Sequence, residues 1–142
     1  MSVIHPDLHA AGERALDRLR KQDSTSEIAC KWTSIFTGIQ TISNRVTPSH
    51  RDSRGRPQWY DLITVVGTGS AAKLILPGLG VDLAYTPGAV VGLCGSIIEH
   101  EVKHWGSGDR VCYAHFMRKA VLERLGCHSE AWVNIQMYRG HA

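Results

Sequence analysis

The chain has 142 residues, of which 43% are hydrophobic and 20% are charged. This size and balance predict one globular domain, 1–142, with a real hydrophobic core, and they exclude disordered and repeat proteins. The formal charge of +3 permits a polyanionic partner without requiring one. The chain begins without the basic-then-apolar pattern of a signal peptide, and no apolar run approaches the roughly 18 residues of a membrane span. We therefore expect a soluble, intracellular protein with no membrane partner.

The first segment, 5–22, carries apolar residues at helical spacing and predicts an amphipathic helix. Its apolar positions are Leu8, Ala11, Ala15, Leu16 and Leu19. Its basic positions, which we interpret as a solvated face, are Arg14, Arg18, Arg20 and Lys21. The following stretch, 22–27, reads as a polar loop.

The pattern then changes to short β-type runs separated by Gly and Pro, at 34–46, 59–67, 71–77, 81–85, 89–93, 96–100 and 110–117. Pro-Gly pairs at 77–78 and 87–88 suit the middle of type II turns. So many short strands predict a sandwich or barrel over about 32–117. A closing helix is predicted at 118–126, ended by Gly126. The stretch 129–142 has no clear pattern.

The four cysteines are far apart and form no CxxC pair, so we expect reduced thiols rather than a zinc site or disulfides. They are Cys30, Cys94, Cys112 and Cys127.

A stronger chemical signal is the His-x-Asp pair formed by His50 and Asp52 in "PSHRDSRG". A facial triad of two histidines and one carboxylate binds iron from one side and leaves the other positions open. In an extended segment, residues i and i+2 point to the same side, so both side chains can converge on one ion. The third ligand must come from a distant strand.

Three histidines are candidates for that third ligand: His100, His104 and His115. We favour His100, because it ends the apolar run "SIIEH" and Arg110 follows ten residues later at the start of another strand. A guanidinium there suits the far carboxylate of a 2-oxoacid, which it binds as a bidentate fork. His104 falls in a predicted turn, and His115 has the wrong parity to share a face with Arg110.

Three stretches carry a resemblance to a known family: "NRVTPSHRDSRGRPQWYDL" (44–62), "LPGLGVDLAYTPGAVVGLCGSIIEHEV" (76–102) and "GDRVCYAHFMRK" (108–119). They resemble the TET/JBP group of iron and 2-oxoglutarate dioxygenases, most of all its fungal branch. The resemblance implies a mostly β fold with flanking helices, a double-stranded β-helix of the cupin-like jelly-roll type. It also implies Fe(II) on His50, Asp52 and His100, with 2-oxoglutarate on Arg110 and a second contact from Arg45.

The resemblance further assigns substrate contacts at the end of the last strand. Phe116 shares parity with Arg110, and in a similar enzyme an aromatic at this position stacks on an extruded base. The alternative for Phe116 is an ordinary core position. Arg118, two residues further along, is a second candidate contact to the base.

The implied reaction uses Fe(II), O2 and 2-oxoglutarate to oxidise a methyl group on a flipped base in DNA. The base is 5-methylcytosine, taken to 5-hydroxymethylcytosine and beyond, or N6-methyladenine. A nuclear location and a monomer are expected. Only 49 residues precede His50, whereas the family usually has a longer amino-terminal region. Two alternatives therefore stay open: an oxygenase of the same fold acting on a protein side chain, and a truncated, non-catalytic relative.

Overall fold

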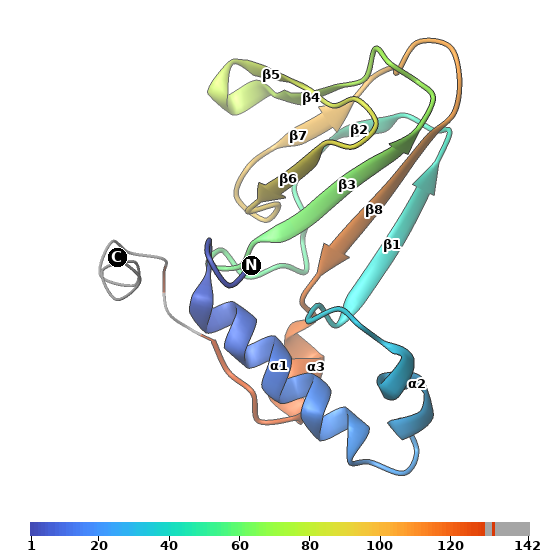
Figure 1. The fold of residues 1–142 in the computed structure, drawn as a ribbon. Coiled ribbons are helices and arrows are strands. Elements are labelled where there is room, and N and C mark those ends of the chain that lie inside the picture. Colours follow the sequence, from blue (N-terminus) through green and yellow to red (C-terminus); the bar gives the residue numbers. More distant parts are fainter. Residues whose placement is uncertain (130–131, 133–142) are drawn as a thin grey trace. The chain divides into compact units, whose positions relative to one another are not determined.

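A computed structural model describes residues 1–129 and residue 132, so the stretch 129–142 lies almost entirely outside the described residues. Its contacts divide the chain into two compact units. One is helical and comprises Met1–Thr37 together with the segment that begins at Met117. The other comprises Gly38–Phe116 and contains every strand of the described chain (Figure 1).

The helical unit contains α1 (Pro6–Arg20), α2 (Ser26–Lys31) and α3 (Lys119–Arg124). Helix α1 matches the predicted amphipathic helix, and it begins where the His5 side chain accepts a hydrogen bond from the Leu8 N–H at 3.2 Å. The polar loop predicted at 22–27 is wrong in its second part, because helix α2 begins at Ser26. No helix in the described part of the chain is both long and apolar enough to span a membrane.

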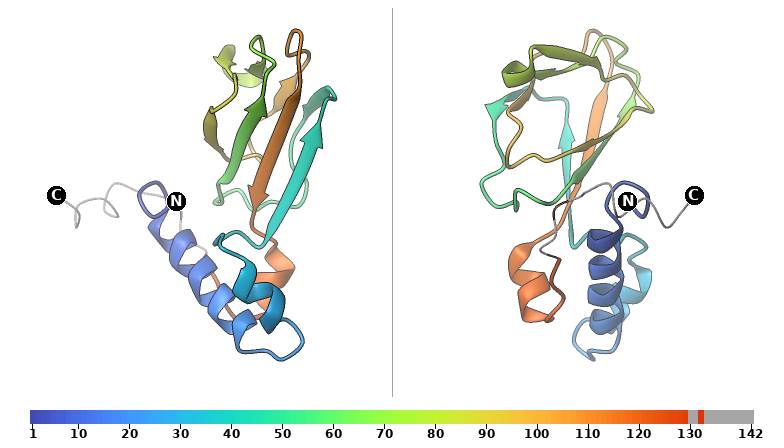
Figure 2. Two further views of the ribbon diagram at one scale, coloured as in Figure 1. Left: turned by 45° about the vertical axis from the view of Figure 1, so that its right-hand side comes forward. Right: turned by 90° about the vertical axis from the view of Figure 1, so that its left-hand side faces the viewer.

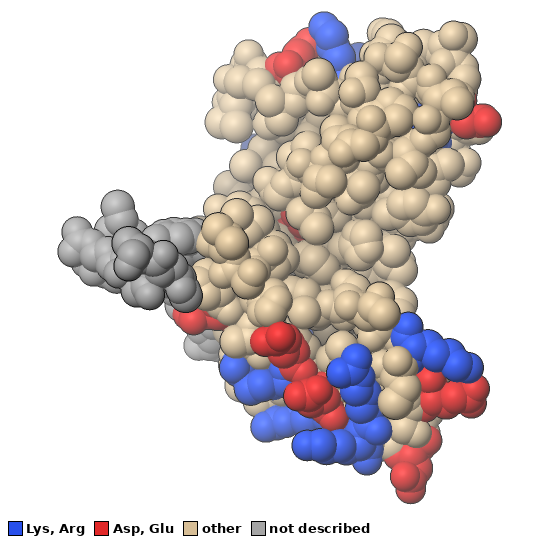
Figure 3. Space-filling view, viewed as in Figure 1, with Lys and Arg blue, Asp and Glu red and all other residues tan. Residues whose placement is uncertain are grey.

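The basic residues of α1 are more than a solvated face. The Arg18 guanidinium donates to the carbonyl of Leu125, the residue that follows α3. The Arg20 guanidinium donates at 3.4 Å to the carbonyl of Trp32, the residue that follows α2. These guanidinium groups satisfy carbonyls that a helix leaves free at its C-terminus. Figure 3 shows cationic and anionic side chains interspersed over the helices, so the visible face of this unit has no patch of a single sign.

The strands of the other unit form two four-stranded antiparallel sheets, in the orders β1-β8-β3-β6 and β2-β7-β4-β5 (Figures 1 and 2). Their bounds are β1 Gly38–Ser43, β2 Thr47–His50, β3 Asp61–Gly67, β4 Lys73–Leu76, β5 Val81–Ala84, β6 Val90–Leu93, β7 His100–Val102 and β8 Arg110–Phe116.

The pairing explains the architecture. β1 pairs with β8, β2 with β7, β3 with β6 and β4 with β5. The first four strands therefore run beside the last four in reverse, as one long antiparallel ribbon that turns back at the 3-10 helix Pro77–Leu79. Coiling this ribbon gives two facing sheets. The additional strand pairs β3–β8 and β4–β7 connect successive coils of the ribbon. This is the predicted double-stranded β-helix.

Three local predictions differ from the structure. The Pro-Gly pair at 77–78 does not form the predicted type II turn. It lies in the 3-10 helix Pro77–Leu79, and the positive φ of 63° falls on Gly80 instead of on the glycine of the pair. The pair at 87–88 does fit a type II turn, since Gly88 has φ 93° and the Ala89 N–H donates to the Thr86 carbonyl at 2.9 Å. The run 96–100 is a turn that ends where β7 begins, so His100 opens a strand instead of closing one.

The core lies between the sheets and is built from the inward residues of each strand. Alternation along β3 buries Ile63 and Val65 and leaves Thr64 facing the other way. The buried cluster comprises Ile63, Val65, Ala72, Leu74, Leu76, Tyr85, Leu93, Val102 and Cys112. All four cysteines of the chain are free thiols, as predicted.

Candidate metal centre

Two of the predicted ligands are brought together by strand pairing. His50 is the last residue of β2, His100 is the first of β7, and the two form a directly opposed pair. Opposed residues project on the same side of a sheet. Since His100 alternates with buried Val102, that side is the interior of the sandwich. The imidazole centroids lie 4.3 Å apart.

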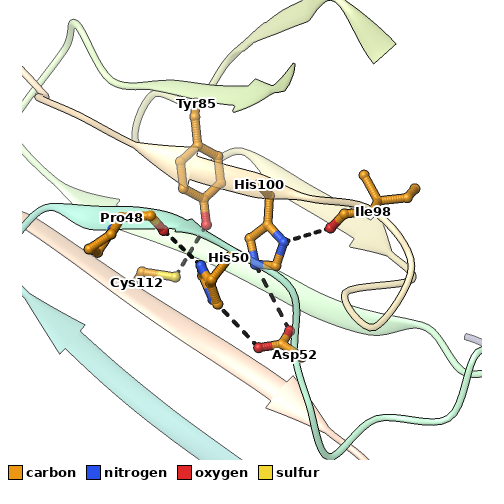
Figure 4. A network of polar contacts seen from close by, with 7 residues as sticks. All are labelled: Pro48, His50, Asp52, Tyr85, Ile98, His100 and Cys112. Carbon is orange, nitrogen blue, oxygen red and sulfur yellow. Dashed lines mark hydrogen bonds and ion pairs between the residues drawn. The ribbon is translucent and has the colours of Figure 1, made fainter. Parts of the chain in front are cut away.

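Asp52 completes the group from outside the strand. Its N–H donates to the Gly95 carbonyl at 2.9 Å, and its two carboxylate oxygens lie 3.5 Å from His50 Nε2 and 3.9 Å from His100 Nε2 (Figure 4). One ligand atom from each of the three residues lies within 4.8 Å of the others. Two imidazole nitrogens and one carboxylate oxygen so close together match the donor set of a non-haem iron site.

Both histidines are oriented in the same way. His50 Nδ1 lies 2.8 Å from the Pro48 carbonyl, and His100 Nδ1 lies 2.9 Å from the Ile98 carbonyl, two residues back in each case (Figure 4). A carbonyl accepts only, so Nδ1 carries the proton and donates it. The Nε2 lone pair of each ring is therefore left for a metal, which is the usual arrangement of histidine ligands.

Arg110, the predicted cosubstrate residue, is the first residue of β8 and only 2% exposed. Its guanidinium donates to the Arg45 carbonyl at 3.3 Å, while its Nε has no hydrogen-bond partner. No carboxylate pairs with it among the residues that the structure describes. A buried cation without a counter-ion is unfavourable unless an anion binds there. The residue thus fits the carboxylate of 2-oxoglutarate.

Tyr85 is a residue of this region that sequence reasoning missed. The Arg110 guanidinium lies 5.5 Å from the centre of its ring, and its hydroxyl is 3.2 Å from Cys112 Sγ (Figure 4). Burial, with the neighbouring thiol, raises the pKa of Tyr85 well above its usual range. The sequence shows an aromatic after a short β run, but nothing local places it beside β8.

Asp61 is a second missed residue. It opens β3 in phase with the inward Ile63 and Val65, a signal visible in the sequence because an acid at such a position is unusual. Burial, followed by the charge of Asp52, raises the pKa of Asp61 to about 7, although a hydrogen bond from the Gly95 N–H acts in the opposite direction.

The other predicted residues take varied positions. The Arg45 side chain is exposed, and its backbone carbonyl is the group that meets Arg110. Phe116 ends β8 in register with Gly38 and packs its ring against that glycine, on the side of β8 that also carries Arg110. In the helical unit, the Arg118 N–H donates to Thr37 Oγ1 at 2.7 Å. His104 is exposed in the loop after β7.

Comparison with known proteins agrees with this geometry. The family model described as Tet_JBP, the oxygenase domain of the 2OGFeDO superfamily, matches residues 1–119. A solved structure, NgTET1 in complex with 5mC DNA, superposes with a TM-score of 0.56 at 18% identity. The match covers 75% of this chain and 42% of that one, so this chain corresponds to less than half of that protein. No curated protein gives a significant match.

The structural likeness supports the fold, and the family match covers most of the chain and contains all three residues of the metal-ligand group. The chain belongs to the Tet/JBP family of oxygenase domains, within the 2-oxoglutarate-dependent dioxygenases.

Proposed function

We propose that the chain is the iron- and 2-oxoglutarate-binding core of an enzyme that oxidises the methyl group of a methylated DNA base. The preferred substrate in this proposal is 5-methylcytosine, with N6-methyladenine as the second base to test. The observation that carries the proposal is the group of His50, Asp52 and His100, whose ligand atoms lie within 4.8 Å of one another while both Nδ1 atoms are held by carbonyls. The likeness to a structure solved with 5mC DNA supports the choice of substrate.

When bound, Fe(II) and 2-oxoglutarate would supply the oxidising chemistry, in which O2 and the cosubstrate yield succinate, carbon dioxide and a hydroxylated methyl group. The residues of the chain fix the geometry. His50 and His100 would hold the metal through Nε2, and the Asp52 carboxylate would offset part of its charge. Arg110 would bind the far carboxylate of the cosubstrate as a bidentate fork.

The His50 and Asp52 side chains are 40% and 44% exposed, whereas His100 is 10% exposed. The ligand group therefore has a closed side and an open side, and the open side can admit a substrate. A base in duplex DNA must leave the stack to reach such a site. In this proposal Phe116 stacks on the flipped base, with Arg45 and Arg118 as additional contacts to the cosubstrate and the base. A nuclear location and a monomeric state belong to the same proposal.

The first test is anaerobic titration of the metal-free protein with Fe(II) and 2-oxoglutarate, following the visible charge-transfer band of the chelate. The parent protein should develop the band, and alanine at any of the three ligand positions should abolish it. His104→Ala is the matched control, because this exposed histidine lies outside the group and should leave the band unchanged. Loss of the band in His104→Ala, with retention in His100→Ala, would refute the ligand assignment.

The second test separates the substrate classes. Succinate release is measured with duplex DNA containing 5-methylcytosine, with N6-methyladenine DNA, with unmodified DNA and with peptides. The proposal predicts release that depends on the methylated base, with the oxidised base found by mass spectrometry. Release that depends on a peptide would favour a protein substrate, and a parent protein without turnover on any of them would favour a non-catalytic relative.

A further inference from the structure

One tight turn, Cys94–Ile98, holds two of the three proposed metal ligands. The N–H groups of Ile97 and Ile98 both donate to the Cys94 carbonyl, at 3.0 and 2.9 Å, which closes the turn. The Gly95 carbonyl accepts the N–H of Asp52, and the Ile98 carbonyl meets His100 Nδ1. Any movement of this turn would therefore displace a carboxylate ligand and rotate an imidazole ligand together.

The turn itself lies between β6 and β7 and belongs to neither strand. Ile97 is 44% exposed, so packing of its side chain contributes little to fixing the segment. The Gly95 N–H, however, faces the Asp61 carboxyl group closely enough to lower the pKa of that group. Gly95 is also the point where Asp61 comes close to the turn, because a Cβ at that position would lie only 2.9 Å from Asp61 Oδ2.

Asp61 is a rigid support for such a contact. It opens β3 and pairs with Leu93 of β6, and the next residue, Leu62, pairs with both β6 and β8. Its side chain projects inward, in phase with Ile63 and Val65. A carboxyl group near the carboxylate of Asp52 is costly in a sandwich interior, and an apolar residue would be expected there if only packing mattered. What an apolar residue could not do is accept the Gly95 N–H.

We propose that Asp61 is a positioning residue of the metal centre, whose side-chain oxygen anchors Gly95 and thereby fixes the Cys94–Ile98 turn that orients Asp52 and His100. The inference rests on the proposed function only in taking these residues as metal ligands. Asp61 itself contacts no metal in this scheme. Its contribution is to restrict the movement of the ligands. Hydrogen bonds that support metal ligands commonly have this effect.

The test compares Asp61→Asn, which keeps an oxygen acceptor of the same shape without the charge, with Asp61→Ala, which removes the acceptor. Fe(II) affinity is measured anaerobically in the absence of any substrate, and the visible spectrum of the Co(II)-loaded protein reports the ligand geometry. We expect Asp61→Ala to bind Fe(II) about 10–100-fold more weakly, the usual effect of losing a group that supports a ligand. Asp61→Asn should stay close to the parent in affinity and in spectrum.

Glu99→Gln is the matched control for charge. Glu99 precedes His100 in the chain, but its carboxylate contacts Ser49 and Arg51 instead of the turn. This variant should bind Fe(II) as the parent does. If Asp61→Ala does not fold, Asp61→Glu replaces it in the test. The longer side chain keeps the charge and moves the acceptor by one methylene group. The Asp61→Glu protein should also bind Fe(II) more weakly than the parent.

The outcomes separate this inference from the proposed function. Parent-like affinity and Co(II) spectrum in the acceptor-removing variant would overturn the role of Asp61 while leaving the metal centre intact. Equal losses in Asp61→Asn and Asp61→Ala would also overturn it, since the charge rather than the hydrogen bond would then matter. A parent protein that binds no Fe(II) would refute the proposed function and this inference together.

Discussion

Gly95→Ala should remove iron binding without unfolding the protein. Gly95 is not among the glycines with positive φ, so alanine is compatible with its backbone. The added Cβ, however, would overlap Asp52 Oδ2 and lie 3.2 Å from Asp52 Cγ, where ordinary contacts begin at 3.4 Å. It would also lie 2.9 Å from Asp61 Oδ2. The carboxylate of Asp52 must therefore turn or move away from the place where it meets the two histidines.

The size of the effect on Fe(II) affinity follows from the small range of distances that a metal–ligand bond tolerates. A movement of Asp52 by even about 0.5 Å exceeds the tolerance of about 0.2 Å in metal–ligand distances. Loss of a supporting hydrogen bond alone costs about 10–100-fold in metal affinity, or about 1.4–2.8 kcal/mol, and displacement of a ligand should cost at least as much. We therefore expect Fe(II) affinity to fall by about 100-fold or more.

The assay is the anaerobic Fe(II) and 2-oxoglutarate titration, run beside thermal unfolding of the metal-free protein. Gly78→Ala is the control, because a Cβ there meets nothing within 4 Å and Gly78 does not have a positive φ. It should bind iron normally. The double variant Gly95→Ala with Asp52→Ala should recover part of any stability lost in Gly95→Ala alone, because the overlapping carboxylate is gone. Normal iron affinity in a folded Gly95→Ala protein would refute the described position of Asp52.

Three further predictions concern the cosubstrate, the pH response and the substrate base. Arg110→Lys keeps the charge but loses the bidentate fork, so 2-oxoglutarate affinity should fall more than Fe(II) affinity in the same titration; equal 2-oxoglutarate affinity would rule out the contact. The pKa of Asp61 is raised from 3.8 to about 7 in the folded state, so the metal-free protein should lose stability as pH rises from about 4 to about 7. The loss should be on the order of 4 kcal/mol in chemical denaturation, and Asp61→Asn should flatten this dependence; an unchanged slope would contradict the raised pKa. Phe116→Ala should cost about 1–3 kcal/mol of base stacking, seen as weaker oxidation of methylcytosine DNA with an intact chelate, whereas a loss of about 3–5 kcal/mol in unfolding free energy would assign Phe116 to the core.

Features that depend on neighbours in the chain could be predicted from the amino-acid sequence. The strands rich in β-branched residues, such as β3, were predictable from local pattern, and so was the alternation that places Arg110 and Phe116 on one side of β8. The spacing of His50 and Asp52 likewise needs only an extended backbone to bring the two side chains to one side. These predictions rest on strand geometry, which has a period of two residues whatever the fold.

Contacts between segments that are distant in the chain depend on how the whole chain folds. The segment Thr47–His50 contains a proline and no apolar run, and it becomes a strand because β7 supplies its hydrogen-bond partners. The contact of Asp61 with Gly95 and that of Tyr85 with Cys112 join segments far apart in the chain. The raised pKa of Asp61 is likewise a property of its surroundings, because desolvation depends on what covers a side chain and the sequence does not state what covers it.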